Sequence, residues 1–194
     1  MLNGVIQPFQ QPWATLAQRW ISIGAVSDDR GVGLKHMTDD DRARELWELG
    51  TQRLGAGQVQ EAVELFERSI AVKPTAEGYT FRGWALSHLG RLEEAIEDCK
   101  RAIQLDAEFG NPYNDIGVYL MQEGRLDEAI AWLEQAKLAK RYEPRHYPYA
   151  NLGRIYERKG RWREALAEYR EALRLEPRYE LAMKAAARLR ARMN

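Results

Sequence analysis

Apolar and small residues recur along this chain at helical spacing, and the whole pattern returns about every 34 residues. Four Glu-Ala pairs set the register, since their alanines follow one another at intervals of 33, 34 and 36 residues. Glycine stands twelve residues and five residues before each alanine. The alanines are Ala62, Ala95, Ala129 and Ala165, the earlier glycines Gly50, Gly83, Gly117 and Gly153, and the later glycines Gly57, Gly90, Gly124 and Gly160. Such self-similarity is typical of a repeat architecture.

Each unit is predicted to form a helix, a tight turn and a second helix. Apolar or small residues occupy three further positions, which lie three residues before, one residue after and seven residues after each alanine. They are Val59, Leu92, Leu126 and Trp162, then Val63, Ile96, Ile130 and Leu166, then Ser69, Ala102, Ala136 and Ala172. The later glycine suits the left-handed end of a helix, and the earlier glycine suits a close crossing of two helices.

In this register the chain resembles the tetratricopeptide repeat family, whose motif runs from an aromatic residue through Leu-Gly, Tyr, Ala and Phe to Pro. The last unit matches best, with Tyr149, Leu152, Gly153, Tyr156, Gly160, Ala165, Tyr169, Ala172 and Pro177. The resemblance covers about residues 38 to 193.

Some positions depart from the motif. The first unit has Leu46 at the aromatic position, and the second has Arg82 for Leu and Cys99 for the aromatic residue. The third unit is two residues longer than the motif, with the excess at residues 141–144. It also places Lys137 where an apolar residue is expected. The second helix of this unit is therefore expected to drift from the repeat register before it ends. Asn111, which precedes Pro112, is expected to be the N-cap of its first helix.

The resemblance implies an all-α fold, a right-handed α-solenoid of four helix-turn-helix units with a C-terminal capping helix and a short N-terminal helix. The expected segments are an extension over residues 1–37, four units within residues 38–177 and the capping helix over residues 178–194. The unit boundaries fall near 43–75, 76–109, 110–145 and 146–179. In the capping helix, Leu181, Ala185 and Leu189 form one apolar stripe, and Lys184, Arg188, Arg190 and Arg192 are expected to face water.

The first 37 residues stand outside the repeats. Pro12 can open a helix over about residues 12–23, in which Trp13, Leu16 and Trp20 lie on one apolar stripe. A flexible linker follows, and Thr38 with Asp41 is expected to cap the first repeat helix. Because Met37 directly precedes this cap, the sequence leaves open whether residues 1–36 are native, an over-called start or a fused segment.

Charge is divided unevenly, although the chain has 29 basic and 29 acidic side chains. Residues 137–194 hold 16 Lys and Arg against 7 Asp and Glu, a net charge of +9, and residues 1–136 carry the balancing −9. This distribution has two interpretations: solvated ion pairs on the helix surfaces, or attraction of the basic end to an acidic partner. The single cysteine, Cys99, excludes a disulfide within the chain and favours a reducing, cytoplasmic location.

Motifs for catalysis, metal binding or nucleic-acid binding are missing. The three histidines lie in different segments, and neither metal-ligand spacing nor a phosphate-binding loop occurs. The basic residues of the last unit alternate with glutamates that would repel phosphates, and no stretch is long enough to span a membrane. We therefore expect no enzyme activity, no cofactor, no metal, no nucleic acid and no membrane.

The resemblance implies that the first helix of each unit lines a concave groove for a partner. The expected groove residues are Trp47, Thr51, Thr80, Phe81, Trp84, Asn114, Asp115, Val118, Asn151, Arg154 and Lys184. The aromatic members would anchor an apolar segment, and the amides would bond a peptide backbone. Packing between repeats is the alternative role for Trp47 and Trp84. The Lys and Asn set with which co-chaperones of this family hold a terminal carboxylate is absent.

The favoured function is therefore a non-catalytic scaffold that binds a peptide or a partner-protein segment in this groove. One alternative is self-assembly, head to tail or by exchange of the N-terminal helix, which could also dock on the groove of its own chain. Another is a regulatory subunit of an enzyme on a different chain.

Overall fold

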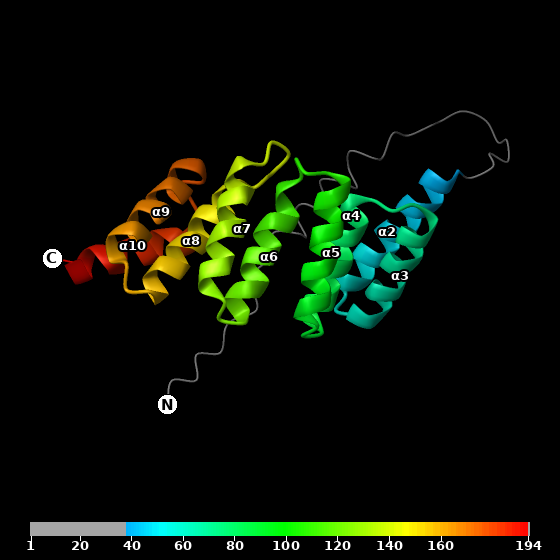
Figure 1. Ribbon diagram of the computed structural model, residues 1–194, viewed down its shortest axis with the longest axis horizontal. Helices are drawn as coiled ribbons and strands as arrows, with labels where there is room; N and C mark the ends of the chain where they lie inside the picture. Colours follow the sequence, from blue (N-terminus) through cyan, green and yellow to red (C-terminus); the bar gives the residue numbers. More distant parts are fainter. Residues whose placement is uncertain (1–37, 194) are drawn as a thin grey trace.

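The computed structural model describes residues 38–193, which form an all-α repeat solenoid (Figure 1). The helices of the described part are α2 Asp39–Gly55, α3 Val59–Val72, α4 Ala76–His88, α5 Leu92–Leu105, α6 Gly110–Gln122, α7 Leu126–Leu138, α8 His146–Arg158, α9 Trp162–Leu175 and α10 Glu180–Met193. Within residues 38–193, no helix is long and apolar enough to cross a membrane.

The helices form two layers. Each repeat is an antiparallel pair, α2 with α3, α4 with α5, α6 with α7 and α8 with α9, and consecutive pairs pack side by side along the molecule (Figure 1). The first helices also contact one another, α2 with α4, α4 with α6 and α6 with α8, so they form one layer that we call the inner row. α10 packs on α9 and covers the C-terminal end of the array.

The turn glycines end the first helix of every pair, as the sequence predicts. All four have positive φ, from 72° at Gly160 to 79° at Gly124, a conformation that L side chains rarely adopt. After α2, the N–H of Gly57 donates to the carbonyl of Leu54 and the N–H of Gln58 donates to that of Arg53. These bonds satisfy carbonyls that would otherwise have no partner at the helix end.

The earlier glycines allow the two helices of a pair to touch. A Cβ added at Gly50 would lie 2.7 Å from the Phe66 ring, and one added at Gly153 would lie 2.7 Å from the Tyr169 ring. These rings stand four residues after the register alanine of their units, and Leu133 and Cys99 occupy the same position in the other two. Glycine is needed because any larger residue would push the helices apart.

The second repeat replaces apolar packing with an ion pair. Arg82, which stands where the family has leucine, donates from Nε and Nη2 to the two carboxylate oxygens of Asp98 at 2.7 and 2.6 Å. Its guanidinium also lies 5.5 Å from the centre of the Tyr79 ring. Because the side chain of Asp98 is only 6% exposed, this carboxylate depends on Arg82 for compensation.

The longer connection at the end of the third unit, residues 141–144, links neighbouring repeats through Arg141. Arg141 pairs with Asp106 at 2.5 Å and with Glu77 at 2.8 Å, and its guanidinium lies 4.0 Å from the centre of the Phe109 ring. The carbonyl of Arg141 also accepts the N–H of Gly110. Because that bond gives the first N–H of α6 an acceptor, the helix begins at Gly110, before Asn111. The prediction that Asn111 is the N-cap of this helix was therefore wrong.

The predictions for the two ends of the array concern the cap of α2 and the buried face of α10, and only the first is fully confirmed. Thr38 and Asp41 form a capping box at the start of α2, as predicted. In α10 the buried positions are Ala182, Ala185, Ala186 and Leu189, whereas Leu181 is 37% exposed. Ala185 and Leu189 are thus buried as predicted, but the prediction for Leu181 was wrong, because the smaller Ala182 takes the buried position where α10 packs on α9. The predicted helix over residues 12–23 lies outside the described residues.

α7 ends at Leu138 and has 13 residues, one fewer than α3, α5 and α9. Lys137, near its end, is nearly buried and pairs with Glu134 and Glu168 at 3.1 Å. The charge at this expected apolar position is thus balanced by one carboxylate of its own helix and one of the next repeat.

Replacing Arg82 with Ala tests the ion pair of the second repeat. The change leaves Asp98 buried and uncompensated, so the free energy of unfolding should fall by about 3 kcal/mol in urea titrations. Arg91→Ala is the matched control, because Arg91 makes the same two-bond contact with Glu94 on the exposed surface and should cost much less. Replacing both Arg82 and Asp98 with Leu should restore most of the loss, and equal losses for Arg82→Ala and Arg91→Ala would contradict this account.

Candidate functional site on the inner helix row

The three predicted aromatic anchors form one cluster that spans two repeats. Phe81 of α4 lies between Trp47 of α2 and Trp84 of its own helix, with 4.8 Å between ring centres on each side. Phe81 and Trp84 are 6% and 7% exposed, and Trp47 is partly exposed. The cluster therefore contributes to packing between repeats, and Trp47 is its most accessible member.

A chain of polar side chains continues from this cluster into the next repeats. The indole N–H of Trp84 donates to a carboxylate oxygen of Asp115 on α6. The amide of Asn114 lies 3.4 Å from the other oxygen of Asp115 and accepts a 3.0 Å hydrogen bond from Asn151 of α8. All these polar groups are buried, so their mutual bonds fix the register of α4, α6 and α8.

Burial raises the pKa of Asp115 from its ordinary value to about 7. Desolvation is the dominant cause, and the hydrogen bonds from Trp84 and Asn114 oppose it only in part. The side chain of Asp115 therefore changes between its protonated and ionised forms near neutral pH.

The remaining predicted residues of α2, α4 and α6, which are Thr51, Thr80 and Val118, are also buried. The hydroxyls of Thr51 and Thr80 donate to carbonyls of their own helices, those of Glu48 and Ala76, at 2.7 Å. Val118 is 8% exposed. A contact of these side chains with a partner stays a prediction.

Two pockets lie toward the ends of the inner row. The N-terminal pocket has a volume of about 740 Å³ and is bordered by α2, the end of α3 and the start of α4, with Trp47 in its wall. It also contains both signs of charge, including Arg44, Lys73, Asp40 and Glu48. The indole N–H of Trp47 is buried and has no hydrogen-bond partner in the described part of the chain.

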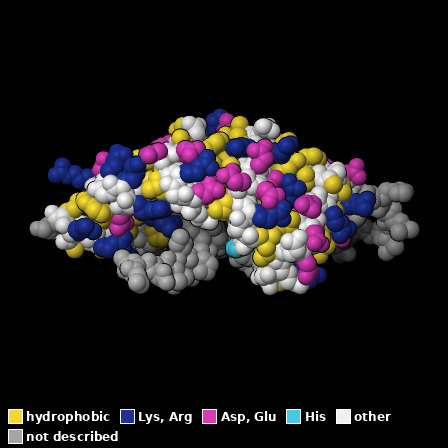
Figure 2. All heavy atoms as spheres, turned by 60° about the horizontal axis from the view of Figure 1, so that its bottom comes forward, with side chains coloured by type: hydrophobic (Ala, Val, Ile, Leu, Met, Phe, Trp, Pro, Cys, Tyr) yellow, Lys and Arg dark blue, Asp and Glu magenta, His cyan; other side chains and the backbone are white. Residues whose placement is uncertain are grey.

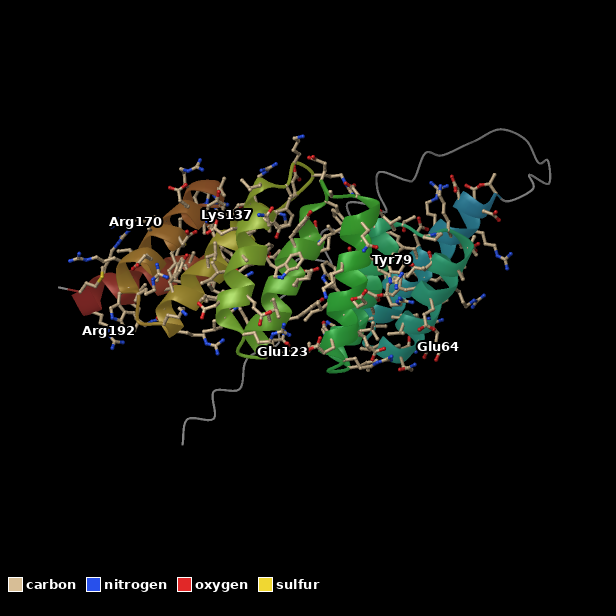
Figure 3. The ribbon with its side chains drawn as sticks, in the orientation of Figure 1. Glu64, Tyr79, Glu123, Lys137, Arg170 and Arg192 are labelled. Atoms are coloured by element: carbon tan, nitrogen blue, oxygen red, sulfur yellow. The ribbon has the colours of Figure 1, made fainter. Side chains whose placement is uncertain are left out.

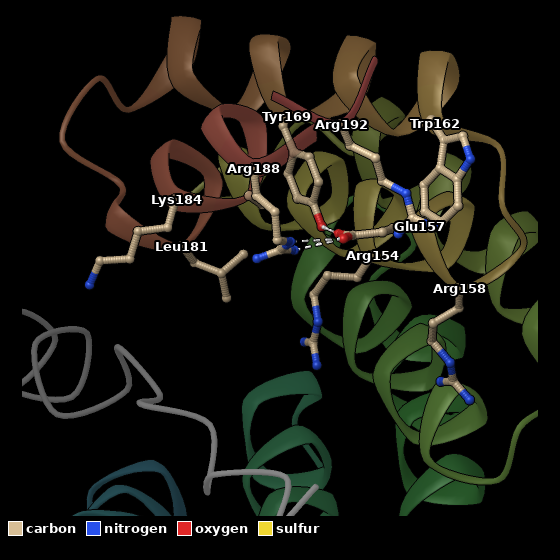
Figure 4. Close-up of a pocket in the computed structure, with 10 residues that line it drawn as sticks. Arg154, Glu157, Arg158, Trp162, Tyr169, Leu181, Lys184, Arg188 and Arg192 are labelled. Atoms are coloured by element: carbon tan, nitrogen blue, oxygen red, sulfur yellow. Dashed lines mark hydrogen bonds and ion pairs between the residues drawn. The ribbon is translucent and has the colours of Figure 1, made fainter. Parts of the chain in front are cut away.

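The C-terminal pocket, which we call the basic pocket, has a volume of about 620 Å³ and lies among α8, α9 and α10 (Figure 4). It contains the predicted residues Arg154 and Lys184. Its full lining is Arg154, Glu157, Arg158, Trp162, Tyr169, Leu181, Lys184, Ala185, Arg188 and Arg192. Arg188 and Arg192 were predicted to face water, and their contribution to a pocket was not predicted. Their spacing of four on α10 was the available signal.

Charges elsewhere on the described surface are largely intermixed. On the face shown in Figure 2, Lys and Arg side chains lie next to Asp and Glu side chains. Many are paired three residues apart within one helix, as Arg161 is with Glu164 and Arg174 with Glu171. The basic excess is nevertheless at the C-terminal end, where Figure 3 places Arg170 and Arg192, far from Glu64 of α3.

Family models for the tetratricopeptide repeat match residues 76–109 and 108–177, which together make up more than half of the chain. The chain belongs to the tetratricopeptide repeat family. A relative, small glutamine-rich tetratricopeptide repeat-containing protein 2 of Mycosarcoma maydis, is 31% identical over 96 residues. That match covers 48% of this chain and 27% of the relative, so this tetratricopeptide repeat protein spans about a quarter of the relative's length.

Solved structures share the fold. A structure from work on pilF of Pseudomonas aeruginosa superposes with a TM-score of 0.75 at 20% identity, over 80% of this chain and 70% of that one. The second tetratricopeptide repeat domain of Spaghetti (RPAP3), solved with the HSP90 peptide SRMEEVD, superposes with a TM-score of 0.50 at 26% identity. The match covers 52% of this chain and 94% of that domain. The neighbour therefore shows that a repeat array of related fold can bind a short peptide.

Replacing Asp115 with Asn tests the raised pKa. The folded carboxyl holds its proton up to about pH 7, whereas the unfolded one loses it near 3.8, so wild-type stability should fall as the pH rises between these values. Asn keeps an oxygen that can accept from Trp84 and does not ionise. Between pH 4 and 8, the wild type should therefore lose about 2 to 4 kcal/mol relative to Asp115→Asn in urea titrations.

The control is Glu64→Gln, which removes a carboxylate on the exposed side of α3 and should keep the wild-type profile. If the wild type and Asp115→Asn showed parallel profiles, the account of Asp115 would be refuted.

Proposed function

We propose that this protein is a non-catalytic scaffold that binds a peptide or partner-protein segment along the inner helix row. The observation that carries the proposal is the arrangement of α2, α4, α6 and α8 in one layer with a pocket toward each end. An extended or helical segment could place side chains in both pockets while its backbone runs along the layer between them.

The relatives support binding but do not identify the partner. The peptide-bound neighbour carries an HSP90 peptide. In this chain Trp47, Thr51 and Phe81 occupy positions at which co-chaperones of the family use Lys and Asn to hold a terminal carboxylate, so we do not transfer that ligand. The proposed partner is one that is recognised by an aromatic wall at one end and by basic side chains at the other.

Trp47 is the residue with which to test the scaffold function. Trp47→Ala should weaken binding of the physiological partner by about 2 kcal/mol or more, because a partly exposed tryptophan in a pocket wall is a typical binding anchor. The measurement is quantitative capture from native extract, followed by calorimetry with the captured protein. Trp132→Ala is the matched control, since Trp132 is also partly exposed but lies on α7 of the outer layer, against Tyr113.

Both variants should be compared with the wild type by circular dichroism, so that an effect on folding is separated from an effect on binding. Equal capture by Trp47→Ala and Trp132→Ala would show that the pocket around Trp47 does not bind the partner.

Self-assembly is a second candidate, favoured by the net charge of +9 over residues 137–194 and −9 over the rest of the chain. Head-to-tail association would bring the opposite ends of two copies together. Sedimentation velocity should then show larger species in low salt than at about 0.3 M salt, where exposed charges are screened over less than 10 Å. A monomer at both salt concentrations and at about 1 mM protein would rule this candidate out.

A further inference from the structure

Cations outnumber acids in the lining of the basic pocket. Its cations are Arg154, Arg158, Lys184, Arg188 and Arg192, and its one acidic residue is Glu157, which gives the lining a formal charge of +4. Glu157 is itself engaged, since it accepts hydrogen bonds from Tyr169 at 3.1 Å and from Arg188 at 2.7 Å (Figure 4).

Two of the arginines are held by neutral groups. Arg158 donates to the carbonyl of Met121 at 3.0 Å, and the guanidinium of Arg192 lies 4.3 Å from the centre of the Trp162 ring. Such contacts orient a guanidinium but do not cancel its charge. Lys184 pairs with Glu180, but both side chains are about three-quarters exposed, so water weakens the pair. The pocket therefore keeps a positive potential.

An apolar surface lies within the same pocket. Leu181 is 37% exposed and projects into it from α10, and the partly exposed Trp162 also lines it (Figure 4). Tyr169 and Ala185 of the lining are only 1% and 4% exposed. The volume of about 620 Å³ suits a few side chains rather than a whole folded surface. A ligand that fits must therefore offer both carboxylates and an apolar side chain.

We propose that the basic pocket binds an acidic partner segment in which carboxylates flank a leucine or a similar apolar residue. This inference rests on the proposed scaffold function and specifies the chemistry of the ligand at the C-terminal end of the inner row. Carboxylates would bond the guanidinium groups, and the apolar side chain would cover Leu181 and the Trp162 ring.

A protein segment is favoured over nucleic acid and over a second copy. A nucleic acid carries a phosphate at every nucleotide, so its backbone would extend beyond the pocket toward the surface of α9, where Glu164, Glu168 and Glu171 would repel it. A short peptide can confine its carboxylates to the pocket lining, which does not include these glutamates. In a second copy, two of the three aspartates at the start of α2 are already paired, Asp40 with Lys73 and Asp41 with Arg44. An external acidic segment has no such pairs to break.

Fluorescence anisotropy with the full chain tests the proposal. The probe is a fluorescein-labelled peptide of Leu-Asp-Glu repeated four times, and its neutral counterpart contains Leu-Asn-Gln. The pocket variant is Lys184→Glu combined with Arg192→Glu, both of which are exposed positions. The control is Arg163→Glu combined with Arg170→Glu, which makes the same charge change at exposed positions of α9 outside the pocket lining. Circular dichroism and melting curves confirm folding, and Lys184→Glu alone is the milder variant.

The pocket variant should weaken binding of the acidic probe about tenfold or more, the control variant less than about twofold, and the neutral probe should bind about tenfold more weakly than the acidic one. The inference is overturned if both variants weaken binding equally or if the acidic probe fails to bind at about 1 mM protein. It is also overturned if a single-stranded RNA dodecamer binds as tightly and responds to the pocket variant in the same way.

The two functional proposals can fail separately. Loss of partner capture by Trp47→Ala, together with no difference between the pocket and control variants, would leave the scaffold function standing and remove the acidic ligand. Discrimination of the acidic probe without any effect of Trp47→Ala would keep the basic pocket as a ligand site and remove the pocket around Trp47 from the proposed binding surface.

Discussion

The close contact between a glycine on the first helix and a large side chain on the second determines the geometry of this protein. In three of the four repeats a Phe, Leu or Tyr side chain lies where the glycine would otherwise carry a Cβ. With the two helices of each repeat at this short separation, the first helices of successive repeats contact one another. The inner row, its polar bonds and its end pockets all depend on that spacing.

The second repeat shows how the constraint is met when the large side chain is missing. Cys99 occupies the position of Phe66, and a Cβ at Gly83 would meet the backbone oxygen of Ala95 at 3.2 Å instead. The helices are then joined by the ion pair of Arg82 and Asp98, which is directional where apolar packing is not. Charged groups thus replace lost packing volume at the repeat that departs from the family motif at both Arg82 and Cys99.

Buried polar side chains couple the stability of neighbouring repeats along the inner row. Trp84, Asp115, Asn114 and Asn151 join three repeats through buried hydrogen bonds, so a change in any one of them affects the stability of its neighbours. At the ends of the row, partly exposed residues line pockets and can be changed with less effect on the array. This division separates the positions that hold the array together from those available for recognition.

The sequence by itself determined the repeat number, the helix pairs and their turns, because positive-φ glycines and the spacing of apolar residues are local signals. It also placed Trp47, Phe81 and Trp84 near one another, but it missed Phe66, whose ring centre lies 5.9 Å from that of Phe81. Tertiary structure decided that Phe81, Trp84 and the amides are buried, because their exposure depends on how closely neighbouring first helices pack. It also decided the role of Arg141, which reaches acidic residues 35 and 64 positions earlier in the chain. The basic pocket arises where α10 brings Arg188 to α8 and Arg192 to α9. That orientation depends on how α10 packs on α9, and the apolar pattern alone placed Leu181 rather than Ala182 in the contact.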